Sequence, residues 1–138
     1  MPPALSACTC SAGDHFKIDS GTGCYRRIVI FHQFLNDDLG CACYLVGDEE
    51  AGIAVVVDPP YVIEPVLEEA ERRGLRLVRT IETHTHADHV SGHGRLALEH
   101  GVPVSVHADA GVDYPNDPMR DGDQIEVGAV TLGVIHTP

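Results

Sequence analysis

The feature that most constrains the fold is the uninterrupted apolar run IAVVV at residues 53–57, which ends at Asp58. A run of this length without alternating polar residues predicts a strand that is buried on both faces of a sheet. Residues 59–74 follow with apolar side chains at helical spacing, and we expect this helix to begin near Glu64, because Pro65 is tolerated only in a first turn. A doubly buried strand followed by an amphipathic helix indicates helices layered against a sheet.

The rest of the chain supplies further strands and one more helix. Strands are predicted at residues 27–35, 41–46, 75–84 and 102–107, a short helix at 94–101, and a final hairpin around Gly128 and Ala129. Residues 1–26 mix Ser, Gly, Pro and Thr with little apolar periodicity, and we expect a disordered leader there. This order of elements predicts an α/β or α+β sandwich with a mainly antiparallel or mixed sheet.

The charge of the chain narrows the classes of partner. Lysine and arginine number 9 against 21 aspartate and glutamate residues, which gives a formal net charge of −12. Such a surface repels phosphate backbones, so nucleic acid is not an expected partner. No stretch approaches the ~18 consecutive apolar residues that span a bilayer, so a membrane is not expected either.

The cysteines bear on the cellular compartment. There are 5 of them, and the N-terminal residues lack the pattern of a secretory signal, so we expect reduced thiols and a cytoplasmic location. Cys41 and Cys43 lie two residues apart in a predicted strand, and we expect both to be small buried side chains on one face.

The candidate metal site is the stretch THTHADH, residues 83–89, which contains His84, His86, Asp88 and His89. The β-branched residues around it favour an extended chain, in which His84 and His86 point to the same side. Asp88 and His89 then lie where the chain turns, and their side chains can fold back towards the same point. Imidazole and carboxylate suit zinc, iron(II) or manganese, and the lack of neighbouring thiolates favours an open catalytic site over a closed structural one. Two other roles stay open: Asp88 as a helix cap, and the stretch as a hydrogen-bonded polar loop.

His84-Thr85-His86-Ala87-Asp88-His89 matches the H-x-H-x-D-H signature, and the chain from residue 27 to 138 resembles the metallo-β-lactamase superfamily. The resemblance implies an αββα sandwich with metals at the sheet edges. The longer stretch THTHADHVSG is similar to the persulfide dioxygenase branch, whereas two glycines usually follow the motif in the glyoxalase II branch. The stretch DYPNDPMRDGDQIEVG resembles members that carry a rhodanese-like domain further downstream.

The resemblance also implies two alternative ligand sets. In the binuclear hydrolases, His84 and His86 bind one metal while Asp88 and His89 bind the other. In the persulfide dioxygenases, one iron(II) takes His84 from this motif, and His86, Asp88 and His89 support it. We therefore treat all four residues as candidate metal ligands and Asp88 as the candidate catalytic residue. Asp58 has two possible places, beneath the motif or in an ordinary turn.

The expected function follows from the same resemblance. It implies iron(II)-dependent oxidation of a glutathione-type persulfide to sulfite and thiol. The alternatives are a glyoxalase II-like thioester hydrolase with one or two zinc ions, or an inactive fragment. The family's next metal histidine follows a segment resembling TPGHTPG, and this chain ends VIHTP. We therefore expect residues 27–138 to be the N-terminal half of the catalytic domain and to lack activity on their own.

Overall fold

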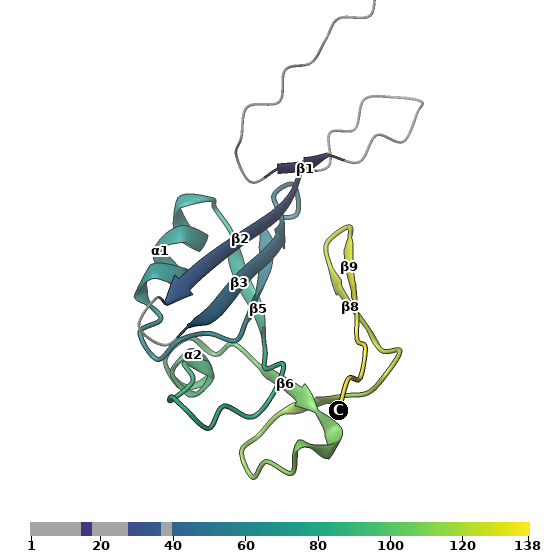
Figure 1. The fold of residues 1–138 in the computed structure, drawn as a ribbon. Helices are drawn as coiled ribbons and strands as arrows, with labels where there is room; N and C mark the ends of the chain where they lie inside the picture. Colours follow the sequence, from purple (N-terminus) through teal and green to yellow (C-terminus); the bar gives the residue numbers. More distant parts are fainter. Residues whose placement is uncertain (1–14, 18–27, 37–39) are drawn as a thin grey trace, which may run out of the picture.

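The computed structural model describes residues 15–17, 28–36 and 40–138. A seven-stranded sheet carries two helices on one face, and a two-stranded hairpin lies on its other side (Figure 1). The strands are β1 (His15–Lys17), β2 (Ile28–Asn36), β3 (Cys41–Asp48), β4 (Ile53–Val57), β5 (Arg76–Ile81), β6 (Val104–His107), β7 (Asp117–Met119), β8 (Gln124–Val127) and β9 (Val130–Gly133). The helices are α1 (Glu64–Arg72) and α2 (His93–His100), with a short 3-10 helix at Ala108–Ala110.

The large sheet is mixed, as the sequence predicts. Its strands lie in the order β1 to β7, with antiparallel pairing from β1 to β4 and parallel pairing from β4 to β7. Parallel neighbours need a crossover connection, and α1 and α2 provide the crossovers from β4 to β5 and from β5 to β6. The predicted fold class is confirmed for the described part of the chain.

Strand β4 is buried on both faces, as its apolar run predicts. Ala54 and Val56 pack under the helices, in the cluster that also holds Ile63 and Val66. Val55 points to the opposite face, where it packs in the cluster that includes the hairpin residue Val127. All of these side chains are fully buried, so β4 is the centre of both cores.

Helix α1 begins at Glu64 with Pro65 in its first turn, where the prediction placed it. The hairpin around Gly128 and Ala129 is also confirmed. Strand β5 ends at Ile81, three residues earlier than predicted, and strand β7 lies in a segment for which no strand was predicted.

Most of the expected leader, residues 1–26, lies outside the described residues. Within it, His15–Lys17 forms strand β1. None of the helices in the described part of the chain is long and apolar enough to cross a membrane.

Candidate metal centre

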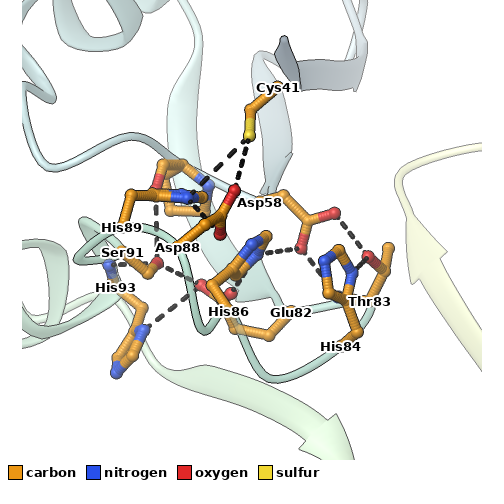
Figure 2. A network of polar contacts seen from close by, with 11 residues as sticks. Cys41, Asp58, Glu82, Thr83, His84, His86, Asp88, His89, Ser91 and His93 are labelled. Carbon is orange, nitrogen blue, oxygen red and sulfur yellow. Dashed lines mark hydrogen bonds and ion pairs between the residues drawn. The ribbon is translucent and has the colours of Figure 1, made fainter. Parts of the chain in front are cut away.

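The histidine-rich loop begins beside Asp58, the residue that follows strand β4. Asp58 has a backbone φ of 49°, a left-handed conformation that aspartate adopts more readily than most residues. Its carboxylate accepts the backbone N–H of Thr83 at 2.8 Å and the Thr83 hydroxyl at 2.5 Å (Figure 2). Of the two places left open for Asp58, the structure has the one beneath the motif, and its carboxylate fixes the first residue of the loop.

The Thr83 hydroxyl also contacts the ring of His84. Thr83 Oγ1 lies 2.7 Å from His84 Nδ1. Because the single hydroxyl proton is donated to Asp58, the hydroxyl oxygen accepts from His84, and Nδ1 of the ring carries the hydrogen. Nε2 of His84 then keeps its lone pair, which is the state in which a neutral imidazole binds a metal ion.

The rings of His84 and His86 lie together, with centroids 4.1 Å apart, so the prediction that they share one side is confirmed. The expected reason is wrong. The chain is not extended here, because β5 has ended at Ile81 and Thr83 and His84 lie in a bend. Ligand atoms of Asp58, His84 and His86 all lie within 4.8 Å of one another, so these three residues form a group able to hold one metal ion.

His86 is held between two carboxylates. Its Nε2 lies 3.3 Å from Asp58 Oδ1 and 3.2 Å from Glu82 Oε2, and its side chain is 7% exposed. This nitrogen is therefore already engaged by protein groups, whereas among the described residues no hydrogen bond or ion pair joins Nε2 of His84 to either carboxylate.

Glu82 is a residue of the centre that sequence reasoning missed. Its side chain is 3% exposed, and its Oε1 accepts the Ser91 hydroxyl at 2.6 Å and lies 3.2 Å from His93 Nδ1. Burial raises the pKa of Glu82 to about 7; the nearby charge of Asp58 adds to the increase, and the Ser91 hydrogen bond opposes it. In the sequence, the only sign of this role is that an acidic residue lies two positions before His84. An acidic residue at the end of a strand does not by itself indicate a site.

Asp88 and His89 form a second group with Cys41, the first residue of β3. Cys41 Sγ lies 3.5 Å from Asp88 Oδ2 and 3.9 Å from His89 Nδ1, and His89 Nδ1 lies 3.0 Å from Asp88 Oδ1. Cys43 is buried as predicted, but the same prediction for Cys41 is wrong: its side chain is partly exposed and faces the site. Asp88 does not cap α2, whose N-cap is Gly92.

The ionisation of this second group reflects its contacts. The hydrogen bond from His89 lowers the pKa of Asp88, and the Cys41 contact lowers it further. Partial burial and the negative charges of Asp88 and Asp58 raise the pKa of the Cys41 thiol. Burial also raises the pKa of the Cys43 thiol, to about 12.

A cavity of about 630 Å³ opens beside the first group. His84 lines it together with apolar side chains from the sheet and the hairpin, among them Val57, Ile81 and Leu132. Asp88 and His89 are not among its lining residues. Polar side chains, among them Glu82, Thr85 and His107, also line it. A cavity that combines apolar walls with polar groups is the usual form of a small-molecule site.

The donor set fits a divalent metal, because imidazole nitrogen and carboxylate oxygen are the preferred ligands of zinc and iron(II). The four candidates from the sequence are divided, with His84 and His86 in one group and Asp88 and His89 in the other. That these residues bind metal, and that Asp88 is catalytic, stay predictions.

The comparison with protein families agrees with the motif and the fold. A family model described as the metallo-beta-lactamase superfamily matches residues 36–138. The chain belongs to the metallo-β-lactamase superfamily.

Two curated relatives of this metallo-β-lactamase domain represent different branches. A hydroxyacylglutathione hydrolase of Rhizobium johnstonii is 35% identical over 96 residues, which covers 68% of this chain and 37% of that protein. The mitochondrial persulfide dioxygenase ETHE1 of Bos taurus is 32% identical over 133 residues, which covers 92% of this chain and 49% of that protein. The chain therefore spans less than half the length of either relative.

Solved structures show the same relationship. The crystal structure of ETHE1 from Myxococcus xanthus matches with a TM-score of 0.69 and 30% identity, covering 74% of this chain and 45% of that one. A metallo-beta-lactamase from Staphylococcus aureus matches with a TM-score of 0.74 and 29% identity, covering 80% of this chain and 35% of that one. The described sheet, helices and hairpin thus correspond to part of the metallo-β-lactamase fold.

Proposed function

We propose that this domain contributes the His84 side of an iron(II) site that oxidises a small-molecule thiol persulfide, of the glutathione type, to sulfite and thiol. The balanced reaction consumes one persulfide, one dioxygen and one water, and it releases one thiol, one sulfite and two protons. The dioxygen and the water together supply the oxygen atoms of sulfite, and the sulfur–sulfur bond is broken. Iron(II) held by few protein ligands supplies the redox centre for this chemistry.

The observation that carries the proposal is that the two neighbouring histidines make different contacts. His86 Nε2 is engaged by Asp58 and Glu82, whereas His84 is oriented through Nδ1 and lines the cavity. A site that takes one histidine from the motif and uses the other to support it is what the persulfide dioxygenase branch implies. A match to a persulfide dioxygenase that is 32% identical and covers 92% of this chain gives further support.

In this proposal the residues around His84 act by orientation. The Asp58 carboxylate holds the Thr83 hydroxyl, and Thr83 in turn fixes the tautomer and direction of the His84 ring. Apolar side chains of the cavity, which include Val57 and Ile81, form one side of the space that the persulfide would occupy. His86 and the buried Glu82 keep the loop in place behind His84.

A thioester hydrolase is the second candidate, because the ligand atoms fall into two groups. His84 and His86 in one group, and Asp88 and His89 in the other, match the division that the resemblance assigns to the binuclear hydrolases. Zinc ions at such a site supply an activated water and polarise a thioester carbonyl. The relationship to hydroxyacylglutathione hydrolases supports this candidate.

The two candidates differ in a direct assay. Dioxygen consumption and sulfite release with glutathione persulfide are measured beside hydrolysis of lactoylglutathione, using the full-length protein loaded with iron(II) or with zinc. We expect persulfide-dependent dioxygen uptake with iron and a loss of more than about 100-fold in His84→Ala, because a metal ligand contributes more than the supporting residues do. The matched control is His100→Ala, which removes an exposed histidine at the end of α2.

Activity confined to the thioester would overturn the dioxygenase proposal and favour the hydrolase. Equal activity of His84→Ala and His100→Ala would overturn the assignment of His84 in either case. We also propose that the protein is cytoplasmic and that its partners do not include nucleic acid.

A further inference from the structure

We propose that Cys41 is a metal ligand and that, with Asp88 and His89, it forms a thiolate-containing site for a zinc-type cation. The dioxygenase proposal does not use Asp88 or His89 as iron ligands, and the hydrolase candidate contains no cysteine. The inference therefore goes beyond both, and it is tested by metal–sulfur bonding instead of turnover.

One ligand atom from each of the three residues lies within 4.8 Å of the other two, close enough for a single ion to contact all three. In a tetrahedral zinc site, bonds of about 2.0–2.3 Å hold neighbouring ligand atoms about 3.3–3.6 Å apart. The observed separations are 3.5 Å from Cys41 Sγ to Asp88 Oδ2, 3.9 Å from Cys41 Sγ to His89 Nδ1, and 3.0 Å from His89 Nδ1 to Asp88 Oδ1. The distances to Asp88 go to its two different carboxylate oxygens, and the Cys41–His89 distance is a few tenths of an ångström longer than the tetrahedral value. Binding of one ion therefore requires small rotations of the Cys41, Asp88 and His89 side chains.

Two separate parts of the chain supply these atoms. Cys41 lies at the start of β3, and Asp88 and His89 lie 47 and 48 residues later in the loop that precedes α2. Figure 2 shows the thiol directed at both the carboxylate and the ring. The His89 side chain is 10% exposed, so its position in the site is fixed by packing. The Asp88 side chain is 58% exposed, which leaves a path for the ion from solvent.

Charge and ligand type also agree with a zinc-type cation. When the ion binds, the Cys41 thiol releases its proton to solvent, and the thiolate and the Asp88 carboxylate together balance a divalent charge. The thiolate makes the group softer than the Asp58, His84 and His86 group, which offers only nitrogen and oxygen. Softer ligands favour zinc over iron(II), so the two groups differ in metal preference.

The test uses cobalt(II) as a spectroscopic substitute for zinc. Cys8, Cys10 and Cys24 are first replaced by serine, so that only Cys41 and Cys43 remain. We expect cobalt to produce a sulfur-to-cobalt charge-transfer band with an intensity of one thiolate per chain. Cys41→Ser abolishes the band, whereas the matched control Cys43→Ala, which alters the buried cysteine two residues along β3, retains it.

A second measurement needs no change at the site. Saturating zinc slows alkylation of Cys41 by iodoacetamide in the otherwise unaltered chain, as read by peptide mass spectrometry, and it still does so in His84→Ala. A charge-transfer band that persists in Cys41→Ser would overturn the proposal. So would equal alkylation rates of Cys41 with and without zinc.

Discussion

At the scale of single residues, Gly92 shows how tightly the candidate centre is packed. Its N–H donates to Pro59 O at 2.9 Å, where Pro60 and Ser91 form a bridge between the end of β4 and the loop before α2. A Cβ atom at Gly92 would lie 2.2 Å from Pro60 O and 2.5 Å from Ile63 Cγ2. Only a residue without a side chain fits, because the opposing atom is backbone.

We expect Gly92→Ala to destabilise the domain by about 1–3 kcal/mol, since the bridge must open to relieve the overlap. Gly94→Ala is a matched control two residues along the chain. A Cβ there meets no atom within 4 Å, and alanine in place of a helical glycine stabilises by about 0.5–1 kcal/mol. Denaturant unfolding of both variants gives the two values, and a shift of the same sign in both would contradict the packing argument.

Sequence reasoning at this scale succeeded where chemistry is local. The proximity of His84 and His86 was predicted from the motif, although the bend that produces it was not. The sequence did not predict Cys41 beside Asp88, because that contact joins residues 47 positions apart through the packing of β3 against the loop. Nor did it predict the buried contacts of Glu82, whose partners Ser91 and His93 become neighbours only when the loop folds back.

At the scale of the element, one carboxylate of helix α1, that of Glu69, pairs with two arginines. Glu69 accepts from Arg72 Nη2 at 2.6 Å and from Arg73 Nε at 2.5 Å, one turn apart on the same face. The Arg72 contact, joined by Arg73, lowers the pKa of Glu69 from 4.5 to about 2. A lowered carboxylate pKa stabilises the folded state above the unfolded pKa, and this stabilisation is lost as the pH falls from 4.5 towards about 2.

We expect Glu69→Gln to reduce the free energy of unfolding at about pH 6 by about 1 kcal/mol, and by less at about pH 3, because the lost contribution is electrostatic. Glu68→Gln, one residue earlier and exposed, is the control and should leave the pH dependence unchanged. Thermal unfolding followed by circular dichroism at both pH values measures the difference. A Glu69→Gln effect of equal size at the two pH values would show that the contribution is not one of charge.

Elements defined by local signals were predicted well, and those defined by distant partners were not. The run at β4 and the proline-started helix α1 both carry their signal within the segment itself. Strand β7 is only three residues long and contains Pro118, so it is a strand solely because β6 lies beside it. Strand β5 stops at Ile81 although the residues after it have strand propensity, because Glu82 and Thr83 turn into the site.

At the scale of the whole molecule, Asp48 joins the hairpin to the large sheet. Its Oδ1 accepts the N–H groups of Glu50 and Ala51, which closes the β3–β4 turn. Its Oδ2 accepts the N–H of Ala129 at 2.7 Å, 81 residues away in the β8–β9 turn. Gly128 beside it has a φ of 65°, and a Cβ there would lie 2.5 Å from Asp48 Oδ2, so the approach requires glycine.

We expect Asp48→Ala to destabilise the domain by about 3 kcal/mol, because three N–H groups lose a charged acceptor. The loss should be largest in the hairpin, whose link through Ala129 is broken. Hydrogen exchange with mass spectrometry should show faster exchange in β8 and β9 than in β4. Glu49→Ala, the exposed neighbour, serves as control. Uniform acceleration across the whole sheet would argue against a specific link.

The change from antiparallel to parallel pairing at β4 has a consequence for the order in which the chain folds. Strands β2, β3 and β4 pair with their neighbours in the sequence, so forming this meander brings together only residues that are close along the chain. Pairing of β5 with β4 is parallel and requires the crossover through α1 to be in place. Asp58 follows β4, and His84 and His86 follow β5, so a nascent chain with only the meander formed has one carboxylate of the first group and neither imidazole. If that group binds a metal ion, as proposed, it can do so only after the non-local step of folding that pairs β5 with β4.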